Sequence, residues 1–211
     1  IYDIMYKIVT SNSKVIVCHE RLYDKEKSHL VYISRLDNDW ISDHKKPPQD
    51  KPRFLYVGRM SKEKGIFSFL KMFDKININA SLSIAGNAEN NKIIQKDVKF
   101  LGYIADQKKL INAYDEHNIM ILPSFTEATP YVVDESLARK RPVIIFEDIE
   151  YIVREKKGIF VSKRDTSSFV KTVKFVMDNY LAIQKNMEKN VLPTKKSMIK
   201  QISDIIKPEN S

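Results

Sequence analysis

Short apolar runs alternate along the chain with longer stretches in which apolar residues recur every three or four positions. Runs such as residues 119–122 (Ile-Met-Ile-Leu) predict strands that are buried on both faces, and the longer stretches predict amphipathic helices. This alternation favours an α/β fold with a Rossmann-like parallel sheet flanked by helices. We expect strands at residues 15–18, 31–33, 53–57, 81–85, 98–101, 118–122, 142–146 and 158–161, and helices at residues 66–75, 107–116, 131–139, 166–180 and 195–206.

A polar segment at residues 45–52 contains three prolines and predicts a linker, because it cannot form regular structure. Only two short strands and some helix are expected before it, which is too little for a domain. We therefore expect a short N-terminal part at residues 1–45, a main domain at residues 46–190 and a C-terminal helix within residues 191–211.

Composition and charge restrict the class of protein. The 211 residues are 43% hydrophobic and 30% charged, as in a globular domain, and no apolar run reaches the about 18 residues of a membrane-spanning helix. The formal net charge of +9 favours anionic ligands, with contact to an anionic membrane as a further interpretation. The lysines are scattered and accompany no nucleic-acid-binding motif, so we expect no nucleic acid partner.

Few residues indicate a compartment or a metal. The single cysteine, Cys18, cannot form an internal disulfide, and we find no secretory signal; this favours a cytoplasmic protein, with peripheral contact at the inner membrane face as an extension. The chain begins with Ile1 rather than Met, so we expect a fragment. The histidines lack ligand spacing, and we interpret residues 37–39 (Asp-Asn-Asp) as a solvated turn, so no metal site is predicted.

Candidate chemistry centres on Glu127 and Glu135, eight residues apart. The predicted strand at 119–122 leads into a loop rich in Pro, Ser and Thr, and we expect a helix to start at Pro130 with Thr129 as its N-cap. Glu127 would then lie just before a helix N-terminus, where free backbone N–H groups and the helix dipole bind anions. Two carboxylates beside an anion site predict a ligand with hydroxyls and phosphates, such as a nucleotide sugar.

A second motif lies about 70 residues earlier. Residues 54–65 (Phe-Leu-Tyr-Val-Gly-Arg-Met-Ser-Lys-Glu-Lys-Gly) follow the start of a predicted strand and end where a helix is expected. Together with Glu127 and Glu135, they resemble the Gly-Arg-x4-Lys-Gly and Glu-x7-Glu motifs of retaining, family 4 glycosyltransferases with the two-domain GT-B architecture. The resemblance spans roughly residues 50 to 180. It implies the donor-binding domain of such an enzyme, preceded by the tail of its acceptor domain.

The resemblance implies metal-independent transfer of a sugar, without a cofactor, from a UDP- or GDP-sugar to a glycan or lipid-linked acceptor. Arg59, Lys64 and Glu127 are then the expected catalytic residues. Arg59 and Lys64 would bind the diphosphate, on which negative charge accumulates as it leaves. Glu127 would contact the donor sugar and Glu135 the ribose hydroxyls. The other residues expected at the donor site lie in loops after strands or before the helix: Gly58, Gly86, Tyr103, Ile104, Ala128 and Thr129.

Two segments depart from the family pattern. Residues 139–142 (Arg-Lys-Arg-Pro) replace a turn that contains glycine, and residues 142–150 are short and lack a Gly-Gly pair. We expect both to lie near the ligand and to alter contacts to the sugar or acceptor. Two alternatives stay open. One is another GT-B nucleotide-sugar enzyme, such as an epimerase, and the other is a degenerate, non-catalytic module that binds a nucleotide or an acidic membrane.

Overall fold

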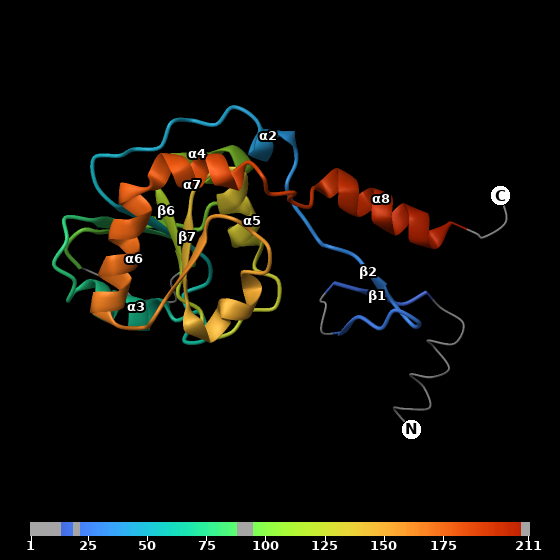
Figure 1. The fold of residues 1–211 in the computed structure, drawn as a ribbon, viewed down its shortest axis with the longest axis horizontal. Helices are drawn as coiled ribbons and strands as arrows, with labels where there is room; N and C mark the ends of the chain where they lie inside the picture. The colour runs from blue at the N-terminus through green and yellow to red at the C-terminus, as the bar shows by residue number, and fades with distance from the viewer. Residues whose placement is uncertain (1–13, 19–21, 88–94, 208–211) are drawn as a thin grey trace, which may run out of the picture. The chain divides into compact units, whose positions relative to one another are not determined.

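The computed structural model describes residues 14–18, 22–87 and 95–207 (Figure 1). By their contacts, Asn38–Leu192 form one compact unit, and Ile1–Asp37 with Pro193–Ser211 form a second, smaller one. The larger unit thus begins before the proline-rich segment, at which we had placed the boundary. The predicted division into an acceptor-domain tail and a donor domain stays a prediction.

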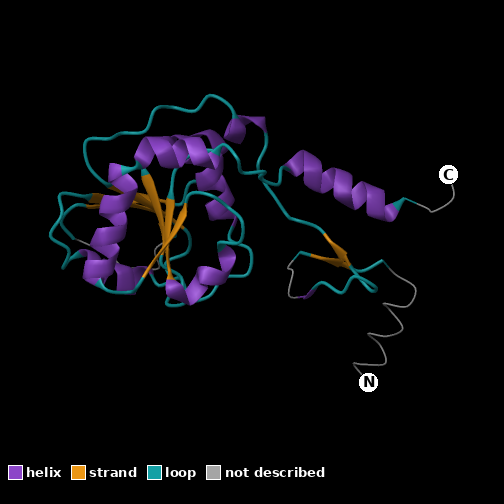
Figure 2. Cartoon of the chain, viewed as in Figure 1, coloured by secondary structure: helices purple, strands orange, loops and turns teal. Residues whose placement is uncertain are grey.

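The larger unit is built on a six-stranded parallel sheet (Figure 2). Its order is β5-β4-β3-β6-β7-β8. The strands are β3 (Arg53–Val57), β4 (Ser81–Ala85), β5 (Val98–Gly102), β6 (Ile119–Leu122), β7 (Val143–Phe146) and β8 (Ile159–Ser162). Every residue of β6 and β7 is buried, as their unbroken apolar runs predict. The strand order reverses between β3 and β6, and open α/β sheets bind ligands beyond the carboxyl ends of the strands at such a point.

Helices cover both faces of the sheet (Figure 1). They are α2 (Asn38–Ile41), α3 (Ile66–Phe73), α4 (Gln107–Asp115), α5 (Tyr131–Ala138), the 3-10 helix η2 (Glu147–Ile152), α6 (Thr166–Asp178) and α7 (Tyr180–Met187). On one face, the rings of Phe69 in α3 and Phe169 in α6 meet edge to face, 5.3 Å apart between centroids. Phe54 of β3, Phe73 of α3 and Phe146 of β7 belong to the same cluster. Burial of each such ring stabilises the fold by about 1.5–3 kcal/mol.

The opposite face carries α2, α4 and α5. The β5–α4–β6 and β6–α5–β7 connections run across the sheet in the direction opposite to β3–α3–β4, so right-handed crossovers place their helices on the other side. Trp40 of α2 packs edge to face on Tyr114 of α4, with ring centroids 5.6 Å apart. The Tyr114 hydroxyl in turn donates a hydrogen bond to Glu135 of α5, so the three helices are joined.

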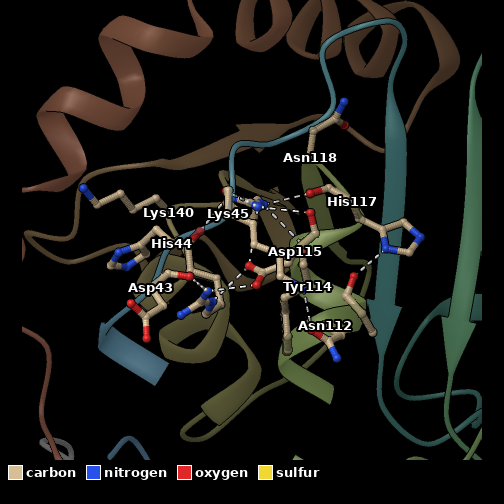
Figure 3. A network of polar contacts seen from close by, with 12 residues as sticks. Asp43, His44, Lys45, Asn112, Tyr114, Asp115, His117, Asn118 and Lys140 are labelled. Carbon is tan, nitrogen blue, oxygen red and sulfur yellow. Dashed lines mark hydrogen bonds and ion pairs between the residues drawn. The ribbon is translucent and has the colours of Figure 1, made fainter. Parts of the chain in front are cut away.

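Two buried arginines attach the segment at residues 39–45 to this face. Figure 3 shows the polar network of this region, in which Lys45 lies near Asp115. The side chains of Arg139 and Arg141 are each 1% exposed, and both contact the carboxylate of Asp115. Nη1 of Arg139 donates to the Ser42 carbonyl at 2.6 Å, and Nη2 of Arg141 donates to the Lys45 carbonyl at 2.9 Å. These contacts explain why the larger unit includes residues that precede the proline-rich segment.

The same arginines correct one expectation. Residues 139–142 lie before the amino end of β7, whereas the ligand edge of a parallel sheet is at the carboxyl ends of its strands. The expectation that this turn borders the ligand is therefore wrong. The two arginine side chains point into the protein because backbone carbonyls and Asp115 provide their acceptors.

Other differences from the predicted elements are local. The helix expected at 166–180 ends at Asp178 as α6, because the ψ of Asn179 is 16°, which departs from helical geometry, and the following helix α7 was not predicted. α2 and η2 were not predicted, because four and six residues are too few for a helical pattern to emerge. The strand expected at 31–33 is instead β2 at His29–Leu30.

The smaller unit consists of two short strands and a helix. β1 (Ile16–Val17) pairs in parallel with β2, and α8 spans Lys195–Ile206, as predicted. Thr194 caps α8, since its side chain accepts from the Ser197 N–H at 3.0 Å. The Ser34 hydroxyl donates to the Pro193 carbonyl at 2.6 Å, which joins the two chain segments of this unit.

Candidate functional site

The loops after β3, β4 and β5 meet at the carboxyl edge of the sheet. The Gly58 N–H donates to the Ala85 carbonyl at 2.9 Å, and the Gly86 N–H donates to the Gly102 carbonyl at 2.9 Å. A Cβ atom on Gly86 would lie 1.9 Å from the Gly58 carbonyl oxygen, so any other residue would separate the two loops. Gly58 and Gly86, both expected at the donor site, therefore lie side by side.

The loop after β3 is also bound to the loop after β6. Lys64 Nζ donates to Oε1 of Glu127 at 2.7 Å, and the Phe125 N–H donates to the Glu63 carbonyl at 2.9 Å. The side chains of Lys64 and Glu127 are 24% and 7% exposed, so solvent screens their attraction less than that of a surface pair. The structure thus brings together one predicted cation and one predicted acid from positions 63 residues apart.

Gly65 permits this approach. Its φ is 65°, in the left-handed region, and a Cβ atom would lie 1.9 Å from the carbonyl oxygen of Pro123. A side chain at this position would both strain the backbone and push the two loops apart. The Lys-Gly pair of the sequence motif therefore has a steric reason as well as an electrostatic one.

The Glu127 carboxylate is held on one side only. The Ser124 hydroxyl donates to Oε1 at 2.7 Å, to the same oxygen that accepts from Lys64. Within residues 14–18, 22–87 and 95–207, Oε2 accepts no hydrogen bond. Oε2 is thus the oxygen of Glu127 that a hydroxyl-bearing ligand can reach.

Arg59 does not join the Lys64–Glu127 ion pair. Its side chain is 76% exposed, and Nη2 lies 3.7 Å from Oε1 of Glu63. Its backbone is fixed, because the Tyr56 hydroxyl donates to the Arg59 carbonyl at 2.6 Å. Burial raises the pKa of Tyr56, and the negative charge of Glu127 raises it further, so this hydroxyl keeps its proton. The predicted diphosphate contact of Arg59 stays a prediction and requires its side chain to turn away from Glu63.

Glu135 lies inside the protein rather than on an exposed helix face. It is 2% exposed and accepts a hydrogen bond from the Tyr114 hydroxyl at 2.9 Å, so its ribose contact also stays a prediction. α5 begins at Tyr131, and Pro130 occupies the N-cap position without a side-chain hydrogen bond. The expected N-cap at Thr129 is therefore wrong by one residue, because the ψ of Pro130 is 98°, which is extended rather than helical.

The remaining predicted site residues lie around the same edge. Tyr103 follows β5 and is 72% exposed, so its ring is accessible to a base, while Ile104 is half-buried. Ala128 is exposed and Thr129 is half-buried in the loop before α5. Their roles at the donor site stay predictions.

Three residues that the sequence did not single out hold the loop that carries Glu127. The Tyr151 hydroxyl donates to the Glu127 carbonyl at 2.6 Å and accepts from the Glu127 N–H at 2.9 Å. Arg164 donates to the Pro123 carbonyl at 3.1 Å and forms an ion pair with Asp148 at 2.6 Å. No motif marks these residues, because Tyr151 and Arg164 bind backbone groups that only the folded chain brings to them, and Asp148 acts through Arg164.

A surface cavity of about 600 Å³ lies elsewhere, on the α4 side of β4 and β5. Its lining includes Lys51, Arg53, Ser83, Lys99 and His117, and none of the predicted site residues. Its lining includes the first residues of β3, β4 and β5, so it lies toward the amino ends of these strands, and we assign the candidate site to the carboxyl edge.

The chain is similar in sequence to known glycosyltransferases. The sequence profile of the family described as glycosyl transferases group 1 matches residues 37–192. The chain is 26% identical over 195 residues to the capsular polysaccharide biosynthesis glycosyltransferase CapM of Staphylococcus aureus, covering 84% of this chain and 50% of that protein. It is 27% identical over 145 residues to an uncharacterised glycosyltransferase of Methanocaldococcus jannaschii, covering 62% of this chain and 37% of that protein. The chain thus spans half or less of each of these relatives.

Solved structures share the fold at low sequence identity. A glycosyltransferase from Rickettsia africae superposes with a TM-score of 0.75 at 14% identity, over 98% of this chain and 67% of the other. Sucrose-phosphate synthase from Thermosynechococcus elongatus superposes with a TM-score of 0.73 at 19% identity, over 96% of this chain and 60% of the other. HepE of Anabaena, solved in complex with UDP and glucose, superposes with a TM-score of 0.69 at 13% identity, over 96% of this chain and 65% of the other. With a family profile that matches most of its length and an α/β fold shared with GT-B glycosyltransferases, the chain belongs to glycosyl transferases group 1.

Proposed function

We propose that the chain is the donor-binding half of a retaining glycosyltransferase that moves a sugar from a nucleotide-diphosphate sugar to a glycan or lipid-linked acceptor. The observation that carries the proposal is the 2.7 Å contact between Lys64 Nζ and Glu127 Oε1 at the carboxyl edge of the sheet. HepE, which shares the fold, has been solved with UDP-glucose, and CapM is named for capsular polysaccharide biosynthesis; both agree with a nucleotide-sugar donor and a glycan product.

In the proposed reaction, the diphosphate leaves as the acceptor hydroxyl attacks the same face of the sugar. The Lys64 ammonium neutralises charge that develops on the leaving phosphate, which is a transition-state interaction and therefore raises the rate. A bound phosphate would compete with Glu127 for Lys64 and would loosen the ion pair. Oε2 of Glu127 would then accept from a sugar hydroxyl, and the exposed Arg59 would add a bidentate phosphate contact.

Binding measurements with a donor panel test this proposal. Calorimetry with UDP, GDP, UDP-glucose and GDP-mannose should find at least one ligand, and a hundredfold excess over Kd should add about 2.7 kcal/mol to the stability of the folded chain. Lys64→Met should weaken nucleoside diphosphate binding by at least about tenfold, because a charge-assisted hydrogen bond is lost. Lys140→Met is the matched control, since Lys140 pairs with Glu188 at the other edge of the sheet.

The outcomes separate the proposal from its rivals. Absence of binding by all four ligands at millimolar concentration would contradict the proposal. If the longer protein binds a nucleotide sugar and converts it without an acceptor, an epimerase-like reaction is favoured. If alanine at Glu127 leaves all functions of the longer protein unchanged, a non-catalytic binding module is favoured.

We also propose peripheral contact with an anionic membrane on the cytoplasmic side, based on the net charge of +9. No helix among the described residues has the length and apolar character needed to cross a membrane. Co-sedimentation with phosphatidylcholine vesicles should require added phosphatidylglycerol and should weaken with salt. Equal binding to both kinds of vesicle would contradict an electrostatic contact.

A further inference from the structure

Tyr151 makes an unusual pair of contacts with one residue of the candidate site. It belongs to η2 and lies just after residues 142–150, the segment that lacks the Gly-Gly pair of the family pattern. Its hydroxyl donates to the Glu127 carbonyl at 2.6 Å and accepts from the Glu127 N–H at 2.9 Å. One side chain therefore occupies both backbone hydrogen-bonding groups of Glu127.

Such a contact restricts the backbone of Glu127 directly. Both φ and ψ of Glu127 are constrained, because its N–H and its carbonyl must point to the same oxygen atom. These angles set the direction of the Cα–Cβ bond and thus of the carboxylate. The side chain itself is held on Oε1 by Lys64 and Ser124. Backbone and side-chain contacts together fix where Oε2 lies.

A second contact from η2 supports the same loop. Asp148 pairs with Arg164 at 2.6 Å, and Arg164 donates to the carbonyls of Pro123 and Ser124 at 3.1 and 3.3 Å. The guanidinium of Arg164 also lies 4.2 Å from the ring centroid of Phe125, within cation–π distance. The beginning of the loop is therefore held by Arg164, and Glu127 in its middle is held by Tyr151.

The occupied N–H group has a consequence for the ligand. The Glu127 N–H already donates to Tyr151, so it is not available to a phosphate oxygen. Tyr151 thus acts on the position of the Glu127 carboxylate and adds nothing to the anion-binding groups. Lys64, which is expected to bind the diphosphate, contacts the side chain of Glu127, whereas Tyr151 contacts its backbone.

We propose that Tyr151 is a positioning residue for donor-sugar selection, because its hydroxyl fixes Glu127 where Oε2 meets the transferred sugar. This inference rests on the proposed function and deepens it. Tyr151 should therefore affect the affinity for a nucleotide sugar and leave the affinity for the corresponding nucleoside diphosphate unchanged. A residue that only stabilised the fold would alter both affinities or neither.

The test compares Tyr151→Phe with Tyr180→Phe in the full chain. Tyr180 is the matched control, because its hydroxyl donates to the Asn118 carbonyl at 2.6 Å at the opposite edge of the sheet. Calorimetry would measure Kd for UDP, UDP-glucose, GDP and GDP-mannose. Tyr151→Phe should weaken the affinity for the nucleotide sugar by about tenfold, while the affinity for the nucleoside diphosphate should change by less than about twofold. Tyr180→Phe should lower Tm and leave the ratio of the two affinities as in the wild type.

Amide hydrogen exchange of Glu127 provides a readout that needs no ligand. Loss of the Tyr151 hydroxyl should speed exchange of this amide, and Tyr180→Phe should not. Unchanged exchange in Tyr151→Phe, or an equal loss of affinity for diphosphate and nucleotide sugar, would overturn the inference and leave the proposed function standing. If the wild type binds no nucleotide at all, the proposed function fails, and the selection role fails with it.

Discussion

The buried cluster of Asp115, Arg139 and Arg141 offers the sharpest test of how this fold is held together. Asp115 accepts from Arg139 at both carboxylate oxygens, at 3.0 and 2.8 Å, and contacts Arg141 at 3.5 Å. The cluster contains two guanidinium groups and one carboxylate. Asp115→Asn keeps the shape of the side chain but removes its charge, so two cations are left in a site without a counterion.

The expected cost follows from what remains. The amide introduced by Asp115→Asn would keep one oxygen for Arg139 but would turn an N–H group toward the other guanidinium donor. Burial already lowers the pKa of Arg141, which indicates that its charge is poorly solvated. Backbone carbonyls around both arginines offset part of this cost, but neutral acceptors bind a guanidinium less strongly than a carboxylate does. Removing one partner of a buried ion pair costs about 3–5 kcal/mol, a large part of the about 5–15 kcal/mol that stabilises a typical domain.

Urea unfolding at pH 7 would measure this loss. Asp115→Asn should lower the midpoint without changing the m value. Trypsin should also cleave faster after Lys45, because the carbonyls of residues 39–45 lose firmly held partners. Asp50→Asn is the control, since Asp50 also accepts from one arginine with both oxygens, but on the surface. If Asp115→Asn lowers the free energy of unfolding by less than about 1 kcal/mol, the reasoning is refuted, because backbone carbonyls alone would then be enough to stabilise both buried guanidinium groups.

Three further predictions concern backbone geometry and pH. Gly65→Ala should destabilise the fold by about 1–3 kcal/mol and weaken nucleotide binding, because the φ of Gly65 is 65° and the new Cβ would clash with Pro123. Urea unfolding would measure the stability and calorimetry the binding, and an unchanged urea midpoint would contradict the prediction. Lys140→Gly should stabilise the fold by up to about 1 kcal/mol in urea unfolding, because Lys140 has a strained φ of 55° and the variant loses only the ion pair with Glu188 near the surface. A lower urea midpoint would show that this ion pair contributes more to stability than the backbone strain costs. Burial lowers the pKa of His117, so the unfolded chain binds this proton more readily than the folded one. The contribution of His117 to the free energy of unfolding is complete above its unfolded pKa of 6.5 and is lost as the pH falls below that value. His117→Gln should therefore flatten the profile of stability against pH between about pH 7.5 and 5. An identical profile in the variant would show that His117 does not cause the loss.

The candidate site was predictable in part. Lys64 and Glu127 were assigned to one site from two motifs, and the folded chain places them 2.7 Å apart. The exposed position of Arg59 and the buried position of Glu135 were not foreseen, because a motif records residue types and spacing but not side-chain direction. Tyr151 was missed because its partner is a backbone group, which no sequence pattern displays.

The sequence by itself determined most of the helices and strands of this protein. Unbroken apolar runs defined the buried strands β6 and β7 because such strands bury both faces, and the bounds of β3, β4 and α8 were predicted to the residue. The tertiary structure alone decided which polar groups meet. Arg139 and Arg141 were expected near the ligand, yet both are buried away from it, because a carboxylate and backbone carbonyls from distant segments offset the cost of removing them from water. Hydrophobic patterning is local, whereas the pairing of buried polar groups depends on segments that only the folded sheet brings together.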